Sequence, residues 1–379
     1  MEPLALYIHW PFCVSKCPYC DFNSHVRVQV DADAWRQALL ADLAHEAALL
    51  PGRRLASIFF GGGTPSLMPP AIVEALIDAA TRHWQPAGDI EITLEANPSS
   101  VEAANFHAFA TAGVNRVSLG LQALDDAALS FLGRAHDVRE GLAALEVAQA
   151  NFTRVSFDLI YALPGQGVEA WAAELERALS FGTDHLSLYQ LTIEQGTRFA
   201  SLYARGALPM PDEDTAADLF ALTQAITSAA GRPAYEVSNH ARPGSESRHN
   251  LVYWRYGDYA GIGPGAHGRR LNAATVRHRK PENWLAAVGR AGHGIVEQTP
   301  LPPEERVREG LLMGLRLAEG IDLAGLALRT GVAAADMVSL QARQRLQDHG
   351  LIDSRNDRLA VTTQGMPVLN AIIAELVRA

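Results

Sequence analysis

Short apolar runs alternate with amphipathic segments through the first half of the chain, and this order limits the folds that the chain can adopt. Six runs have the length of buried strands, and the segments between them repeat their apolar residues with helical spacing. The runs are 4–10, 55–60, 89–96, 115–121, 154–162 and 185–191, and the amphipathic segments are 33–50, 70–84, 100–112, 137–150 and 168–182. Because helical crossovers connect parallel neighbours, we expect a parallel sheet of the α/β class. Six units are too few for a closed eight-stranded barrel, which predicts an open, partial (β/α)6 TIM-like barrel.

The pattern becomes irregular beyond residue 192. Three features there are expected to close the open side of the barrel, namely a helix near 212–230, a strand at 233–238 and a glycine-rich segment at 256–268. A proline-containing break at 299–305 then separates off a C-terminal region. We therefore expect two domains, a barrel over 1–300 that includes a closing insertion at about 193–300, and a second domain over 301–379.

The C-terminal region has the element order of a winged-helix module. Helical patterns cover 303–318, 323–331 and 334–349, two short strands surround a turn within 351–365, and a final helix follows. Residues 300–379 hold nine Arg, no Lys and ten Asp or Glu, a net charge of minus one. A wing that reads DNA normally has a basic excess, so a structural or partner-docking role is favoured.

Composition and the N-terminal residues indicate the cellular location and the kind of partner. Hydrophobic residues make up 48% of the 379-residue chain, but no apolar run approaches the roughly 20 residues that span a bilayer. The N-terminus lacks the basic stretch and apolar core of a secretion signal, so we expect a cytoplasmic protein. A formal charge of −10 repels polyanions, and no nucleic-acid partner is expected.

All three cysteines of the chain lie within eight positions, at Cys13, Cys17 and Cys20, directly after the first predicted strand. In a reducing compartment such a group is more typical of metal ligands than of disulfides. The spacing Cys-x3-Cys-x2-Cys can bind three irons of a [4Fe-4S] cube and leave the fourth iron open for a small molecule. The alternative is a zinc site, with His9 or His25 as the fourth ligand.

Other polar residues and a glycine turn stand at the ends of the predicted strands. The turn Gly61-Gly62-Gly63-Thr64-Pro65 follows the second strand, and its bare backbone can approach a ligand closely. Glu95, Gln122 and Asp158 lie at the ends of the next three strands. In a parallel β/α barrel these ends share one mouth, where active sites are found. The cysteine loop is expected to open at the same mouth.

The cysteine spacing, the GGGTP turn at 61–65 and LPGQ at 163–166 together resemble the radical S-adenosylmethionine (SAM) superfamily over about residues 1–300. The resemblance implies that the open iron binds SAM, and that an electron from the reduced cluster can cleave SAM to a 5'-deoxyadenosyl radical. It also implies a SAM site. The residues of that site would be Tyr7, Tyr19, Gly62, Gly63, Thr64, Glu95, Gln122, Arg134 and Asp158.

Within the superfamily the chain is similar to the branch that contains oxygen-independent coproporphyrinogen III oxidase and the haem chaperone HemW. The oxidase pattern is Cys-x3-Cys-x2-Cys-x-Cys, but Phe22 stands here at the last position. HNLVYW at 249–254 matches the His-Asn-x-x-Tyr-Trp signature of the HemW-type proteins. Its members His249, Asn250, Tyr253 and Trp254 are the candidate haem residues, and either His249 ligates iron or it fills the side of the barrel. His267 is expected near the SAM adenine or the haem.

The resemblance implies a protein that binds haem as cargo and delivers it to apo-haemoproteins, membrane respiratory enzymes among them. It leaves open a homodimer that depends on the cluster. The alternative is a radical SAM enzyme that decarboxylates the propionates of coproporphyrinogen III, which the absence of the fourth cysteine disfavours. A DNA-binding iron–sulfur regulator is a third hypothesis, and the charge of the C-terminal region speaks against it.

Overall fold

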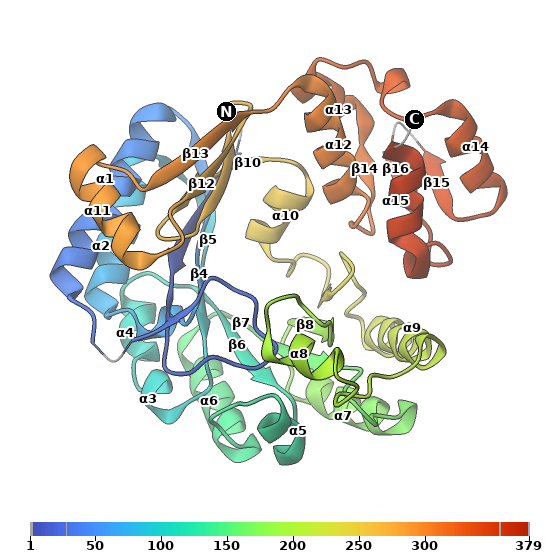
Figure 1. Cartoon of the computed structure of the whole chain (residues 1–379), viewed down its shortest axis with the longest axis horizontal. Helices are drawn as coiled ribbons and strands as arrows, with labels where there is room; N and C mark the ends of the chain where they lie inside the picture. The colour runs from blue at the N-terminus through green and yellow to red at the C-terminus, as the bar shows by residue number, and fades with distance from the viewer. Residues whose placement is uncertain (1–2, 28, 356–357, 378–379) are drawn as a thin grey trace.

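The computed structural model describes residues 3–27, 29–355 and 358–377 and contains one large sheet (Figure 1). Its centre is formed by six strands at the predicted positions, all parallel to one another. These are β1 (Pro3–Trp10), β4 (Arg54–Gly62), β5 (Gln85–Ala96), β6 (Arg116–Gln122), β7 (Arg154–Tyr161) and β8 (His185–Gln190). The complete order is β13-β12-β11-β10-β1-β4-β5-β6-β7-β8-β9, so within the described residues the sheet has two ends. The expected α/β partial barrel is confirmed.

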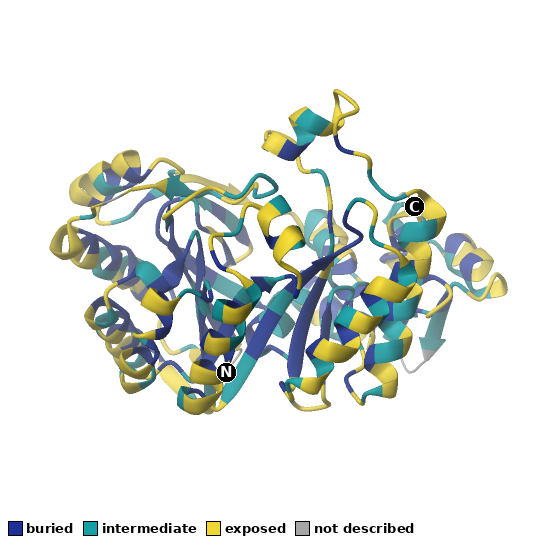
Figure 2. Cartoon of the chain, turned by 90° about the horizontal axis from the view of Figure 1, so that it is seen from below, coloured by how far each residue is buried: buried dark blue, intermediate teal, exposed yellow. Residues whose placement is uncertain are grey.

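Helices follow the central strands as the periodicity predicted. They include α1 (Ala32–Leu49), α2 (Pro70–His83), α6 (Val138–Asn151), α7 (Val168–Ser180) and α9 (Glu213–Ala229). The helix expected over 100–112 is divided into α3 (Ser100–Ala103) and α4 (Phe106–Thr111), because the Asn105 amide bonds three residues back to the Glu102 carbonyl. Two short helices that we did not predict are α5 (Asp126–Phe131) and α8 (Arg198–Tyr203). Figure 2 shows the strands buried and the outer faces of the helices exposed.

The segment after β8 extends both edges of the sheet. The prediction of a strand at 233–238 is wrong. The strand in this part of the chain is β9 (Asn239–Ala241), which begins just after that range and pairs antiparallel with β8. Glu236 accepts hydrogen bonds from Ser238 N and the Asn239 side chain, which turns the chain just before β9. Helix α10 (Arg248–Trp254) comes next.

Four further strands continue the sheet from the other edge of β1. They are β10 (Asp258–Ile262), β11 (His267–Arg270), β12 (Ala273–Arg277) and β13 (Ile295–Pro300), and α11 (Pro281–Ala291) lies between the last two. β10 is parallel to β1, and the later strands form an antiparallel meander. A Cβ atom on Gly261 would lie 1.9 Å from the His267 carbonyl oxygen, so this approach of β10 to β11 requires glycine.

The C-terminal region has a hydrophobic core of its own, built from residues such as Leu311, Leu326, Leu359 and Ile373. Its helices are α12 (Pro303–Gly314), α13 (Leu323–Thr330), α14 (Leu340–Asp348) and α15 (Leu369–Val377). A small antiparallel sheet joins β14 (Ile321–Asp322), β16 (Arg358–Val361) and β15 (Ile352–Arg355). The winged-helix-like order is thereby confirmed, although the helix expected over 334–349 begins as a short 3-10 turn. Among the described residues, no helix combines the length and the apolar character needed to cross a bilayer.

A fully buried group of four charged side chains ties α1 to the meander. Arg277 donates to Asp42 at 2.8 and 3.1 Å and to Glu46 at 2.9 Å. Arg270 forms a two-pronged ion pair with Glu46 at 2.6 and 3.1 Å. The two positive and two negative charges balance, which is the condition for burying them at a tolerable cost.

Candidate functional site

The cysteine loop leaves the C-terminal end of β1 and is closed at its base by two short parallel strands. These are β2 (Phe12–Cys13) and β3 (His25–Val26), and the His25 amide also donates to the Pro11 carbonyl at 2.7 Å. All three thiols are free and partly buried. Burial raises the pKa of the Cys13 and Cys20 thiols, and the neighbouring Cys17 raises it further. The loop thus gathers three thiols that interact electrostatically.

Two polar groups of the barrel approach the sulfur atoms. Thr64 Oγ1 lies 3.4 Å from Cys13 Sγ, and Arg134 Nη1 lies 3.4 Å from Cys17 Sγ. A hydroxyl donor and a guanidinium stabilise negative charge on sulfur. This donor set fits an anionic iron–sulfur cluster, in which each cysteine binds a different iron.

The zinc alternative finds less support. His9 is already bonded at both ring nitrogens, to the Tyr7 hydroxyl at 3.0 Å and the Asn23 carbonyl at 2.9 Å, and burial lowers its pKa to about 4. The Nε2 atom of His25 is buried without a partner among the described residues. In the described part of the chain, however, no three His, Cys, Asp or Glu side chains are grouped tightly enough to hold a single ion. The three cysteines therefore suit a multinuclear cluster better than one zinc ion.

The glycine turn after β4 packs directly against the cysteine loop. Gly63 N donates to the Trp10 carbonyl at 2.7 Å, and Thr64 N donates to the Phe12 carbonyl at 2.8 Å. A Cβ atom on Gly63 would lie 2.7 Å from the Phe12 oxygen and 3.0 Å from Cys13 Sγ. Only glycine allows the two segments to come this close.

Substitution Gly63→Ala is expected to displace the first cysteine and lower the cluster content of anaerobically reconstituted protein at least about threefold, because the new methyl group meets backbone that cannot move aside. Iron and sulfide analysis measures the effect. Gly289→Ala is the matched control, since a Cβ at that helical position meets nothing within 4 Å. Equal iron content in both variants would contradict the close packing described above.

Glu95 and Asp158 are two partly buried carboxyl residues near the C-terminal ends of β5 and β7. Glu95 accepts a hydrogen bond from Gly62 N at 3.2 Å, and Asp158 accepts one from Ser118 Oγ at 3.3 Å. Burial, with a smaller effect from Asp158, raises the pKa of Glu95 to about 8, and burial raises the pKa of Asp158 to about 6. Each carboxyl group retains unused acceptor capacity, which suits hydroxyl and ammonium donors of a ligand.

Arg134 is held by a residue that the sequence analysis missed. Its Nη2 atom donates to Asn97 Oδ1 at 2.6 Å and to the Gly120 carbonyl at 3.0 Å, while Asn97 Nδ2 donates to Thr64 Oγ1 at 3.1 Å. Arg134 Nε is buried without a partner among the described residues. Asn97 directly follows the last residue of β5, two positions beyond Glu95, and a polar residue at this strand end is the signal that would have found it.

The remaining predicted SAM residues lie near this network. Gln122 adopts a left-handed backbone conformation at the end of β6. The side-chain amide nitrogen of Gln122 would lie 2.8 Å from a Cβ atom on Gly120. Gln122 therefore lies close to the hydrogen bond between Arg134 and the Gly120 carbonyl. Tyr19 packs its ring against Phe199, and burial raises the pKa of its hydroxyl.

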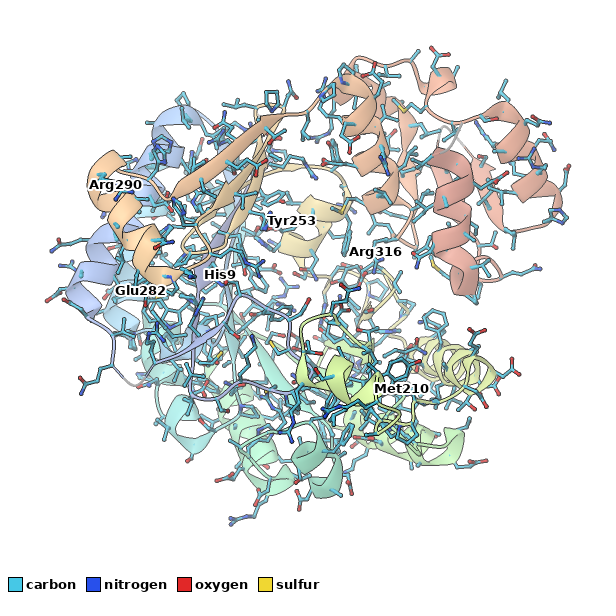
Figure 3. The ribbon with its side chains drawn as sticks, viewed as in Figure 1. His9, Met210, Tyr253, Glu282, Arg290 and Arg316 are labelled. Atoms are coloured by element: carbon cyan, nitrogen blue, oxygen red, sulfur yellow. The ribbon has the colours of Figure 1, made fainter. Side chains whose placement is uncertain are left out.

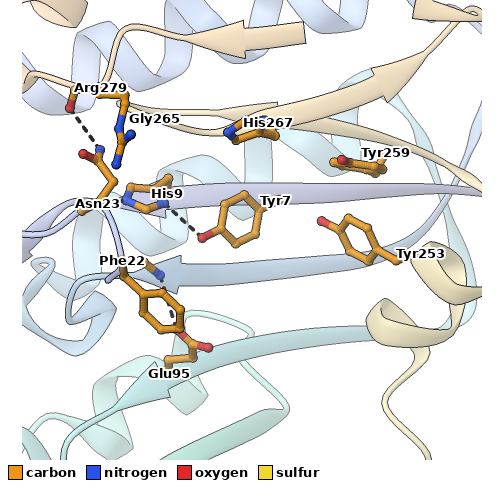
Figure 4. A pocket seen from close by; sticks show the side chains of 11 residues that line it. Tyr7, His9, Phe22, Asn23, Glu95, Tyr253, Tyr259, Gly265, His267 and Arg279 are labelled. Carbon is orange, nitrogen blue, oxygen red and sulfur yellow. Dashed lines mark hydrogen bonds between the residues drawn. The ribbon is translucent and has the colours of Figure 1, made fainter. Parts of the chain in front are cut away.

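A cavity of about 430 Å³ opens at this mouth (Figure 4). Of the predicted SAM residues, Tyr7, Gly62 and Glu95 line it, and Phe22 lines it at the position where the oxidase has its fourth cysteine. The other lining residues are His9, Asn23, Tyr253, Tyr259, Gly265, His267 and Arg279. The volume is in the range of small-molecule sites. Figure 3 shows that His9 and Tyr253 reach the region from different elements, β1 and α10.

Of the four candidate haem residues, Tyr253 alone is among the residues that line the cavity. His249 is 3% exposed and bonded at both ring nitrogens, to Ser57 Oγ at 2.9 Å and to the Tyr253 hydroxyl at 3.0 Å. Burial lowers its pKa to about 3. Iron ligation by His249 would require one of these bonds to break, and in the arrangement described His249 positions Tyr253.

The other two members of the motif contact residues outside the cavity lining. Asn250 Nδ2 donates to the Tyr235 hydroxyl at 3.3 Å. The Arg316 guanidinium lies 4.9 Å from the centre of the Trp254 ring, which links α10 to the C-terminal region.

Comparison with known proteins agrees with this geometry. Residues 7–178 match the Radical SAM superfamily, and residues 301–368 match the HemN C-terminal domain. The chain is 40% identical to the radical S-adenosyl methionine domain-containing protein 1, mitochondrial, of Bos taurus, over 98% of this chain and 87% of that protein. It is 37% identical to the heme chaperone HemW of Escherichia coli, over 98% of each chain.

The fold also has a solved counterpart. Coproporphyrinogen III oxidase (HemN) from Escherichia coli, described as a radical SAM enzyme, superposes with a TM-score of 0.82 at 25% identity, over 99% of this chain and 90% of that one. The resemblance inferred from the cysteine spacing and the glycine turn is therefore confirmed. The chain belongs to the radical SAM superfamily, in the family of the heme chaperone HemW.

Proposed function

We propose that this protein is a haem chaperone, which carries a SAM-binding [4Fe-4S] cluster, binds haem and transfers it to apo-haemoproteins such as respiratory enzymes. The observation that carries the proposal is similarity to HemW along nearly the whole chain. Two local features support it, namely Phe22 at the position of the oxidase's fourth cysteine and the HNLVYW helix beside the cavity. Cytoplasmic location and a homodimer are parts of the same proposal, as is a domain boundary near residue 300.

Different residues at the mouth would bind the cluster and SAM. Cys13, Cys17 and Cys20 would hold the cluster, and Thr64 and Arg134 would stabilise charge on its sulfur ligands. When bound, the cluster supplies an open iron for the amino and carboxylate groups of SAM. Gly62 and Glu95 form the cavity wall that would receive the methionyl and ribose groups.

Substitutions Glu95→Gln and Asp158→Asn are each expected to weaken SAM binding about tenfold or more. Both replace a carboxyl oxygen that can accept a hydrogen bond by an amide NH2 that cannot, and leaving a buried donor without its acceptor costs about 1–3 kcal/mol. Equilibrium dialysis of SAM against cluster-reconstituted protein measures the affinity. The exposed Glu169→Gln on α7 is the control and should bind like wild type. Wild-type affinity in both test variants would remove these carboxylates from the site.

The function is tested by haem transfer. Haem-loaded protein is mixed with an apo-haemoprotein of the b-type respiratory enzymes, and the recovery of acceptor activity is followed alongside a sample of free haem. Faster or more complete recovery than with free haem is the expected result. Apomyoglobin serves as an unrelated acceptor, which separates directed transfer from simple release. Recovery no better than with free haem would overturn the proposal.

The competing function is that of an oxygen-independent coproporphyrinogen III oxidase, favoured by the match to HemN over 99% of this chain. Reconstituted protein, SAM, a reductant and coproporphyrinogen III are incubated without oxygen, and porphyrins and 5'-deoxyadenosine are quantified by chromatography. We expect no decarboxylated product, because Phe22 replaces a residue of the oxidase motif. Several turnovers to decarboxylated product would make the protein an oxidase.

A further inference from the structure

The histidine that lines the cavity with uncommitted ring nitrogens is His267, the first residue of β11. It is exposed, and none of the hydrogen bonds among the described residues uses its ring. His9 also lines the cavity, but both of its ring nitrogens are bonded. Since ligation of haem iron needs a free imidazole nitrogen, His267 is better prepared for it than His9 or the buried His249.

A rigid turn places His267 beside the cysteine loop. A Cβ atom on Gly263 would lie 2.3 Å from the His9 carbonyl oxygen, and one on Gly265 would lie 2.3 Å from Asn23 Nδ2. Asn23 Nδ2 donates to the Pro264 carbonyl at 2.9 Å, and Gly263 N donates to the buried Asp42 at 3.2 Å. These contacts fix the backbone just before His267, so its position does not depend on a mobile loop.

Aromatic surface and a positive charge lie next to His267. Tyr253 and Tyr259 pack with ring centres 4.2 Å apart, and both line the cavity. The exposed Arg279 lines it as well, and its guanidinium has no carboxylate partner among the described side chains. Aromatic faces suit a porphyrin plane, and a guanidinium suits a propionate.

The cavity therefore has two walls of different chemistry. Figure 4 shows Tyr7 between Glu95 on one side and His267 with Tyr259 on the other. The first wall comes from the ends of β4 and β5, where the expected SAM residues lie. The second wall comes from the segment 253–279.

We propose that His267 is the axial ligand of haem iron, with the porphyrin against Tyr253 and Tyr259 and a propionate paired with Arg279. This inference rests on the proposed haem-binding function and assigns its site. His249 then acts as a positioning residue, since it holds the hydroxyl of Tyr253.

The test compares ferric haem binding by the cluster-containing wild type, His267→Ala, His267→Met and His249→Gln. Resonance Raman spectra excited in the Soret band report the axial ligand, and haem titration reports the affinity. His267→Ala is expected to lose the histidine-ligated spectrum and about tenfold or more in haem affinity. Added imidazole should restore the spectrum, because His267 is exposed and its removal leaves an accessible space. His267→Met should bind haem with a different ligand spectrum. His249→Gln should keep the histidine-ligated spectrum but bind haem more weakly, because Tyr253 loses the partner of its hydroxyl.

The outcomes separate the two hypotheses. A wild type that fails to bind haem overturns the proposed function. A wild type that binds haem, together with a His267→Ala variant of unchanged spectrum and affinity, overturns the assignment of His267 alone. If His267→Ala loses SAM affinity and keeps haem affinity, the assignment is equally wrong, and His267 belongs to the SAM wall.

Discussion

Substitution Cys17→Ser is expected to leave anaerobically reconstituted protein with less than about one iron per chain, where the wild type holds about four. The loop offers three thiols, and within the described residues no fourth cysteine is present to replace a lost one. Cys17 is the residue whose sulfur Arg134 approaches, so its loss also leaves a partly buried guanidinium without that contact. Iron and sulfide analysis, together with the visible absorbance of the cluster, measures the result.

The matched control is Val14→Ala in the same loop. Val14 is 69% exposed, so its truncation should change neither the loop nor the cluster. Circular dichroism of both variants checks that the barrel is folded, because the thiols lie in a loop and contribute little to the core. A full cluster in Cys17→Ser protein would show that the ligand assignment is wrong.

The second large effect is expected in the buried charge network. Substitution Arg277→Ala should lower the free energy of unfolding by about 3–5 kcal/mol, because it leaves Asp42 and Glu46 buried with excess negative charge. Asp42 would keep donors from Trp284 Nε1 and two backbone amides, but no cation. Urea unfolding followed by fluorescence measures the change.

Arg290→Ala is the control for that measurement. Arg290 is exposed on α11, as Figure 3 shows, and surface substitutions of this kind change stability by about 0.5 kcal/mol or less. A similar small loss in Arg277→Ala would mean that the two carboxyl groups take up protons or water when the arginine is removed. The network would then hold the meander in place without adding much stability.

The central strands were predictable because they are buried on both faces. Strands such as β1 and β4 appear in the sequence as continuous apolar runs, which need no knowledge of their partners. β9 was missed because Asn239–Ala241 has no apolar pattern, and its conformation depends on pairing with β8. The run 233–238 has strand-like composition, but the Glu236 contacts turn the chain there.

For the site, residue types were predictable and their contacts were not. The spacing of the cysteines and the position of Glu95 at a strand end are local features of the sequence. The hydrogen bond of His249 to Ser57 joins residues 192 positions apart, and no local pattern indicates it. The same is true of Arg279, which reaches the cavity only because β12 and α11 bring it back to the cysteine loop.

The position of β1 in the sheet has a consequence for the order of synthesis. β1 is made first, yet one of its two neighbours is β10, at Asp258–Ile262. A growing chain that has completed β8 therefore still exposes one hydrogen-bonding edge of β1, directly below the cysteine loop. The second wall of the cavity forms only when the ribosome has passed Arg279. Until then the cysteine loop lacks the contacts that Asn23 makes with the Pro264 and Arg279 carbonyls in the finished fold.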